Sequence, residues 1–132
     1  MSKGEEQIAR LLTRFKIPFT QEKTFYDLKH GTYRYDFYIE DYNNKPAIIE
    51  INGAQHYQYI PNFYPSERWW RAALERDRRK ISYALSNNIA IYIIPYWDLP
   101  NIRKISDLFK EEYRAKNRWH NDEIRFQLFK KS

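Results

Sequence analysis

Two acidic residues, Asp36 and Glu50, lie in neighbouring segments whose other residues are largely apolar or aromatic. Burying an unpaired carboxylate is unfavourable, so an acid in such a segment needs a partner. If the two segments pair as strands through the turn at 41–45, the carboxylates approach each other and repel unless a cation lies between them. Carboxylate oxygens suit Mg²⁺ or Mn²⁺ rather than zinc. The pair therefore predicts a divalent-metal site.

His56 and Gln55 follow Glu50 after the turn residues Asn52 and Gly53. A single histidine is more often a structural hydrogen-bond partner than a catalyst. Here, however, it follows the end of a strand that carries a candidate metal ligand, and active-site loops usually lie at such ends. We expect the turn to direct the imidazole of His56 toward Glu50.

Two further acids lie on predicted helices. On a helical projection of about 100° per residue, Asp77 falls in the middle of the apolar stripe of 70–85, with Lys80 at its edge. Asp77 is either functional or the buried partner of an arginine such as Arg34. Glu5 lies beside the apolar stripe of 8–15, where it is either a site residue or a first-turn acid favoured by the helix dipole.

The pattern of apolar residues predicts the elements that must position these side chains. In 32–40 the alternation places Tyr35, Phe37 and Ile39 on one face and Asp36 on the other. Segment 89–96 is apolar on both faces, which indicates a central strand covered on two sides. The result is one α/β domain. We expect helices over 5–15, about 66–86 and 102–113, strands over 19–28, 32–40, 46–52 and 89–96, and a polar, basic C-terminus.

The charge of the 132-residue chain is unevenly distributed. Residues 1–67 hold 8 Lys/Arg and 9 Asp/Glu, whereas residues 68–132 hold 15 and 8. The basic second half predicts a polyanionic partner, nucleic acid above all; the alternative is merely a soluble basic surface. The absence of cysteine, of a signal sequence and of a long apolar run predicts a soluble, cytoplasmic protein that does not enter a membrane.

Several motifs together resemble the PD-(D/E)XK nuclease superfamily, and most closely its branch of very-short-patch-repair-like and phage homing-type endonucleases. The resemblance covers about residues 4–97. It rests on "GEEQIARLL" with Glu5, "DFY" with Asp36, "IIEINGAQHY" with Glu50, and "RDRRKISYALSNNIAIYIIPY" with Asp77 and Lys80. It implies a restriction-endonuclease-like core over 1–97, of order αβββαβ with a mixed central sheet between helices, and a basic helical extension over 98–132 on the same domain.

One position departs from the superfamily pattern. The residue two after Glu50 is usually lysine, or aspartate in many members of this branch, and here it is Asn52. An amide does not neutralise developing charge as an ammonium does, although it can orient a water or coordinate a metal weakly. Lys80 or His56 is then expected to supply the missing positive charge.

The resemblance implies a divalent-metal-dependent DNA endonuclease of a bacterial or phage-infected cell. Asp36 and Glu50, with the Ile51 carbonyl, would hold Mg²⁺ or Mn²⁺, and His56 would act as general base or acid. Glu5 and Asp77 would orient waters, fix His56 or bind a second ion, and Gln55 would position the phosphate. The alternatives are an inactive nuclease-fold subunit that binds nucleic acid and a structure-specific enzyme, either a Holliday-junction resolvase or a mismatch nickase.

Basic residues of the second half are the expected DNA contacts, mostly to phosphates. For any single arginine, a solvated helix face is the alternative. The aromatic loop 57–65 is expected either to insert between bases or stack on them, or to cover the core or form a dimer contact. A homodimer or a larger nucleoprotein assembly is a further expectation, since it would extend the recognised site. The expected contacts are Arg68, Arg71, Arg76, Arg78, Arg79, Arg103, Lys104, Lys130 and Lys131.

Overall fold

The computed structural model describes residues 1–131 as one α/β fold. The order of the elements up to residue 95 is helix, three strands, helix, strand, as the sequence predicts. They are α1 (Lys3–Arg14), β1 (Thr20–Lys23), β2 (Tyr35–Tyr42), β3 (Lys45–Asn52), α2 (Glu67–Ser86) and β4 (Ala90–Pro95), followed by α3 (Ile105–Leu108) and α4 (His120–Lys131).

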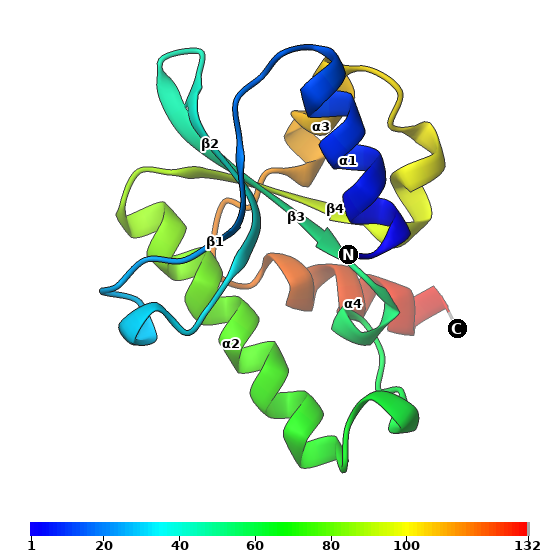
Figure 1. The fold of residues 1–132 in the computed structure, drawn as a ribbon. Helices are drawn as coiled ribbons and strands as arrows, with labels where there is room; N and C mark the ends of the chain where they lie inside the picture. The colour runs from blue at the N-terminus through cyan, green and yellow to red at the C-terminus, as the bar shows by residue number, and fades with distance from the viewer. Residues whose placement is uncertain (132) are drawn as a thin grey trace.

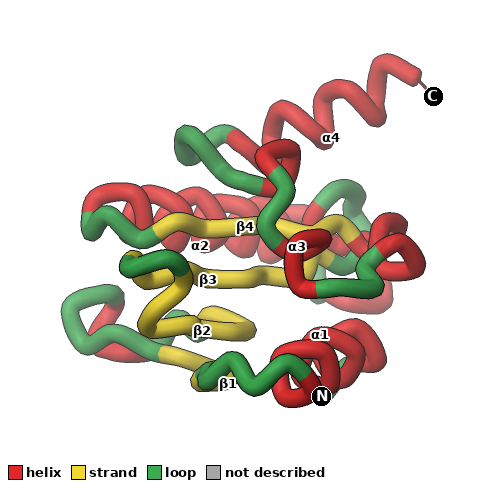
Figure 2. Tube along the Cα trace, turned by 90° about the horizontal axis from the view of Figure 1, so that it is seen from above, coloured by secondary structure: helices red, strands yellow, loops and turns green. Residues whose placement is uncertain are grey.

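The sheet has the strand order β1-β2-β3-β4, with antiparallel pairs up to β3 and a parallel pair between β3 and β4. The antiparallel turn from β2 to β3 is made by Asn43 and Asn44, both with positive φ, as two-residue hairpin turns require. Helix α2 connects β3 to β4 across one face, while α1 and α3 cover the other (Figures 1 and 2). The mixed sheet between helices agrees with the α/β prediction.

Each face of the sheet has its own apolar core. Ile8 and Leu12 of α1 pack with Phe37 and Ile49 on one face. Ile81 of α2 packs on the other face, with a cluster that includes Ile48, Ile91 and Tyr35. The predicted placement of Tyr35 beside Phe37 is therefore wrong, because Tyr35 packs on the α2 side of the sheet while Phe37 packs on the α1 side.

The ends of the two long helices follow the sequence signals. The N–H of Glu5 donates to Ser2 Oγ at 3.1 Å, which caps α1. Helix α2 ends at Asn87–Asn88, and Asn88 adopts a left-handed φ of 57°, which lets the N–H of Ile89 donate to the Ala84 carbonyl at 2.9 Å. Both helices therefore lie close to their predicted bounds.

Two predicted elements are shorter in the structure. The strand predicted over 19–28 ends at Lys23, because Phe25 leaves the sheet and packs against Tyr35, Tyr38 and Tyr83 on the α2 side. The helix predicted over 102–113 is a single turn, α3, because Phe109 turns inward and stacks on Tyr42 with ring centroids 3.7 Å apart.

The predicted central position of β4 is wrong. β4 is the last strand of the sheet, yet Ile91–Pro95 are buried on both faces. Its outer edge is partly covered by the chain after α3: Tyr92 forms an isolated bridge with Arg114, and the N–H of Ala115 donates to the Ile91 carbonyl at 2.9 Å. An edge protected in this way has the same apolar composition as a central strand.

Candidate active site

The site begins where β2 and β3 separate. Regular pairing ends at Phe37 and Ile49, and beyond it side chains take over the main-chain bonds. The N–H of Asp36 donates to Glu50 Oε2 at 2.9 Å, and the N–H of Ile51 donates to Asp36 Oδ2 at 2.8 Å. The two acids therefore lie side by side on neighbouring strands, as the sequence predicts.

Asp36 forms an acidic group with Glu5 of α1 and Glu22 of β1. One carboxylate oxygen of each lies within 4.8 Å of those of the other two. Glu22 reaches this position through a distortion of β1: its φ is 54°, and the strand register passes from Gln21 to Lys23 without it. Positive φ is rare for a non-glycine residue and is found often at functional sites.

The acidic group forms no direct ion pair in the part of the chain that the structure describes, and the cation that acts on Asp36 there is Lys80, which is paired with Glu50. None of the ion pairs there involves Glu5, Glu22 or Asp36. Burial and, next, the charge of Glu50 raise the pKa of Asp36 to about 8. Lys80 offsets this repulsion only in part, because its direct partner is Glu50, and three acids so gathered are an arrangement that a bound cation stabilises.

Glu50 has a different partner from Asp36. Lys80 of α2 forms a largely buried ion pair with Glu50 Oε1, and its ammonium lies 5.1 Å from the centre of the Tyr35 ring. Burial of the ammonium is the largest single effect and opposes its charge, but Glu50, Asp77 and Asp36 together outweigh burial and raise the pKa of Lys80. The Tyr35 hydroxyl donates to the Lys80 carbonyl at 2.8 Å, which fixes this turn of α2 to the sheet.

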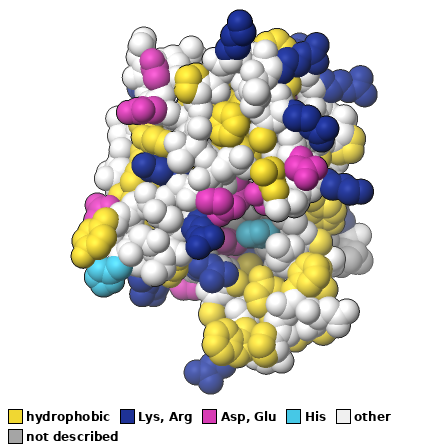
Figure 3. Space-filling view, in the orientation of Figure 1, with side chains coloured by type: hydrophobic (Ala, Val, Ile, Leu, Met, Phe, Trp, Pro, Cys, Tyr) yellow, Lys and Arg dark blue, Asp and Glu magenta, His cyan; other side chains and the backbone are white. Residues whose placement is uncertain are grey.

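His56 and Asp77 form a second pair. Nδ1 of His56 lies 2.7 Å from Asp77 Oδ2, and both side chains are largely buried. Asp77 was expected either to act at the site or to pair with an arginine such as Arg34; its observed partner is the imidazole. The turn Ala54–His56 therefore aims His56 at Asp77 of α2 rather than at Glu50. Acidic side chains and a histidine meet in a hollow near the centre of one face (Figure 3).

The other residues predicted for the site have structural contacts. Asn52 is buried, and its amide donates to Tyr57 Oη at 3.2 Å and to Asn121 Oδ1 at 2.9 Å. Gln55 accepts the indole N–H of Trp70 at its main-chain oxygen, 2.6 Å away. Its side chain folds over Gly53, where an added Cβ would lie 2.6 Å from Gln55 Oε1. A larger residue at position 53 would therefore displace the Gln55 side chain.

The predicted DNA contacts do not form one patch. Arg68, Arg71, Arg76 and Arg79 are exposed on α2, whereas Arg103 and Lys104 are exposed beside α3, on the opposite side of the sheet (Figure 2). Arg78 differs from its neighbours, because it is held by Glu75 at 3.0 Å and Asp122 at 2.6 Å and so joins α2 to α4.

The aromatic loop 57–65 is divided between core and surface. Tyr57 is buried against Trp97, and Tyr59 lies against Trp70. Phe63 is 58% exposed. The first part of the loop therefore covers the core, while its tip offers an aromatic side chain to solvent.

Glu22 is the site residue that sequence reasoning missed. Its segment, "FTQEK", shows no apolar face that would make an acid unusual. What marks Glu22 is its left-handed backbone conformation, which can be seen only in the folded chain and not in the sequence.

Comparison with known proteins shows that part of the chain is similar in sequence to a viral protein. Over 69 residues it is 33% identical to "Uncharacterized protein 307L" of Invertebrate iridescent virus 6. The match covers 52% of this chain and 34% of the viral protein, so the chain spans about a third of that relative's length. No family profile matches the chain, and no solved structure matches it. Within residues 1–131, no helix combines the length and apolar character needed to cross a membrane.

Proposed function

We propose that this protein is a divalent-metal-dependent endonuclease that hydrolyses phosphodiester bonds in DNA, with a core of the PD-(D/E)XK type. The observation that carries the proposal is the group of Glu5, Glu22 and Asp36, none of which forms an ion pair within residues 1–131, beside the ion pair of Glu50 with Lys80. Three carboxylates without nitrogen or sulfur ligands suit Mg²⁺ or Mn²⁺. When bound, such an ion makes water more acidic and stabilises the negative charge of the phosphate in the transition state.

The chain's own residues divide the remaining work. Asp77 holds Nδ1 of His56, which leaves Nε2 for proton transfer; no residue within 1–131 forms a hydrogen bond with that nitrogen. A neutral imidazole held in this way can take a proton from water or return one to the leaving oxygen. Lys80 supplies the ammonium that the position of Asn52 lacks, from the helix rather than from the strand.

The basic residues of α2 support DNA as the substrate. Exposed arginines on one helix face bind phosphates and give affinity that falls steeply with salt. These contacts would fix the position of the protein on DNA. The protein would act in the cytoplasm of a bacterial or phage-infected cell.

A second candidate function is nucleic-acid binding without cleavage, as a subunit of a larger assembly. It is favoured by Asn52, whose side-chain NH₂ is engaged in joining Tyr57 to Asn121. A third, cleavage of branched or mismatched DNA, would use the same site.

Cleavage of supercoiled plasmid, a four-way junction and a mismatched duplex with Mg²⁺ separates the three functions. The wild type is expected to nick plasmid DNA, and Asp36→Asn is expected to lose that activity by at least about 100-fold, as loss of a group that stabilises the transition state does. The matched control is Glu40→Gln, an exposed acid on the same strand. Full activity of the Asp36 variant would contradict the proposal, and binding without cleavage by the wild type would favour the second function.

A further inference from the structure

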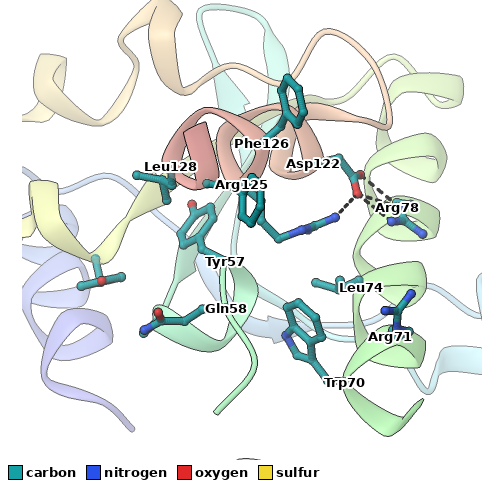
Figure 4. Close-up of a pocket in the computed structure, with 13 residues that line it drawn as sticks. Tyr57, Gln58, Trp70, Arg71, Leu74, Arg78, Asp122, Arg125, Phe126 and Leu128 are labelled. Carbon is teal, nitrogen blue, oxygen red and sulfur yellow. Dashed lines mark hydrogen bonds and ion pairs between the residues drawn. The ribbon is translucent and has the colours of Figure 1, made fainter. Parts of the chain in front are cut away.

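A deep cleft lies beside the candidate active site, between α2, α4 and the chain that follows β3. Its volume is about 890 Å³, which is within the range of pockets that bind organic ligands. Tyr57, Trp70 and Leu74 form its inner wall, and Phe126, Leu128 and Phe129 of α4 form its outer wall. Figure 4 shows Arg125 reaching across it from α4 toward Asp122 and Arg78.

The lining of the cleft combines aromatic rings with guanidinium groups. Arg71, Arg78 and Arg125 line it together with a single acid, Asp122. Asp122 accepts hydrogen bonds from Arg78 and Arg125, both at 2.6 Å, while Glu75 also pairs with Arg78 and Glu67 pairs with Arg71. The guanidinium groups are therefore held in place by carboxylates, and the ligand is expected to combine hydrogen-bond acceptors with a flat apolar part.

Arg125 is incompletely satisfied in the described structure. One guanidinium nitrogen, Nη2, donates to Asp122, and the guanidinium carbon lies 5.8 Å from the centre of the Trp70 ring. Its Nη1 is buried and has no hydrogen-bond partner within residues 1–131. An unpaired buried donor is unfavourable, and a ligand that brings an acceptor would relieve it.

The cleft is physically joined to the candidate active site. The indole N–H of Trp70 donates to the main-chain oxygen of Gln55, which precedes His56. The same short segment therefore forms the wall of the cleft and carries the imidazole. Ala54 and Tyr57, which line the cleft, lie on either side of His56 in the sequence.

We propose that this cleft binds an unpaired nucleotide of the DNA strand next to the position of cleavage. An unpaired base offers a ring face for the aromatic wall, and its phosphate offers negative charge to the arginines, as in proteins that bind single strands. A fully paired duplex offers no free ring faces. An amphipathic helix of another protein would match the apolar wall but would not bring an acceptor to the unsatisfied Nη1 of Arg125. The inference rests on the proposed function for the identity of the strand.

The test is binding in EDTA, which requires no cleavage. The probes are a fully paired duplex and the same duplex with a short unpaired stretch that carries 2-aminopurine, a base that loses fluorescence on stacking. The wild type is expected to bind the second probe roughly 5- to 150-fold more tightly and to quench its fluorescence, since stacking contributes about 1–3 kcal/mol per base.

The double variant Phe126→Ala/Phe129→Ala removes two aromatic rings that are 57% and 75% exposed and line the cleft. It should lose the preference and the quenching and keep the affinity for the paired duplex. The control is Trp69→Ala, which removes an exposed ring of α2 outside the cleft lining and should keep both.

Equal binding of the two probes by the wild type would overturn the inference, as would a preference that survives the double variant. Sedimentation separates a further outcome: a double variant that changes only the oligomeric state would assign the cleft to contact between copies of this chain and overturn nucleotide binding. Failure of the proposed function appears instead in the Mg²⁺ cleavage assay, as absence of nicking by a protein that binds the unpaired probe.

Discussion

The main-chain N–H of Asp36 donates a hydrogen bond to Glu50 Oε2, 2.9 Å away, and so joins these two acids of neighbouring strands. The other carboxylate oxygen of Glu50, Oε1, forms an ion pair with Lys80, while the carboxylate of Asp36 lies close to those of Glu5 and Glu22. The two acids that appear equivalent in the sequence therefore have different electrostatic surroundings. Glu50 is neutralised by Lys80, whereas Asp36 forms no ion pair within residues 1–131.

The first prediction is that Asp36→Asn stabilises the metal-free protein. The pKa of Asp36 is raised from 3.8 to about 8 in the fold, so the folded state binds this proton more tightly than the unfolded state. Its favourable contribution is complete below about pH 3.8 and is lost as pH rises toward about 8. Asparagine mimics the protonated form. In EDTA near neutral pH, the variant should unfold with a free energy about 1–3 kcal/mol larger than that of the wild type.

Urea denaturation across this pH range measures the effect. The advantage of the variant should grow from acidic to mildly alkaline pH, and Glu40→Gln should show no such trend. If the wild type is the more stable protein throughout, the acidic group is not strained in the absence of a ligand.

The second prediction concerns Glu22. If it is one of three carboxylates that share an ion, Glu22→Gln should weaken Mn²⁺ binding by at least about tenfold, because a ligating charge is lost. Titration calorimetry measures the affinity, and the exposed Glu6 of α1 provides the control variant Glu6→Gln. Unchanged affinity in Glu22→Gln would remove β1 from the site.

The third prediction concerns the ion pair of Lys80 with Glu50. Lys80→Met leaves a buried carboxylate without its partner and should lower the free energy of unfolding by about 3–5 kcal/mol. The double variant Lys80→Met/Glu50→Gln should recover most of that loss, since no buried charge remains. Denaturant unfolding of the single and double variants measures the coupling. A double variant that is no more stable than Lys80→Met would show that Lys80 acts through its packing on Tyr35.

Most of the long elements could be predicted because their signals are local. The apolar stripes of α1 and α2 and the two asparagines that end α2 depend on residues within a few positions of one another. The approach of Asp36 to Glu50 was predictable for the same reason, since one short turn sets the pairing of their strands.

The features that the sequence did not predict depend on contacts between residues far apart in the chain. The edge position of β4 depends on a segment more than twenty residues later, which covers its open side at Tyr92. The place of Glu22 depends on a left-handed residue that no propensity favours. The pairing of His56 with Asp77 depends on how α2 crosses the sheet, so the sequence indicated both residues without indicating that they meet.

The fourth prediction tests whether that pairing serves proton transfer. A carboxylate at Nδ1 fixes the tautomer that leaves Nε2 free to accept a proton, whereas an amide can donate to Nδ1 and favour the opposite tautomer. Asp77→Asn should therefore reduce kcat for plasmid nicking by on the order of 10²–10⁴ with little change in KM, and the alkaline plateau of the pH–rate profile should fall with it. Glu112→Gln, an exposed acid beyond α3, is the control. If His56 only anchors the turn to α2, Asp77→Asn will lower the midpoint of urea denaturation while kcat of the folded variant stays at the wild-type value, and the imidazole will have no part in the chemistry.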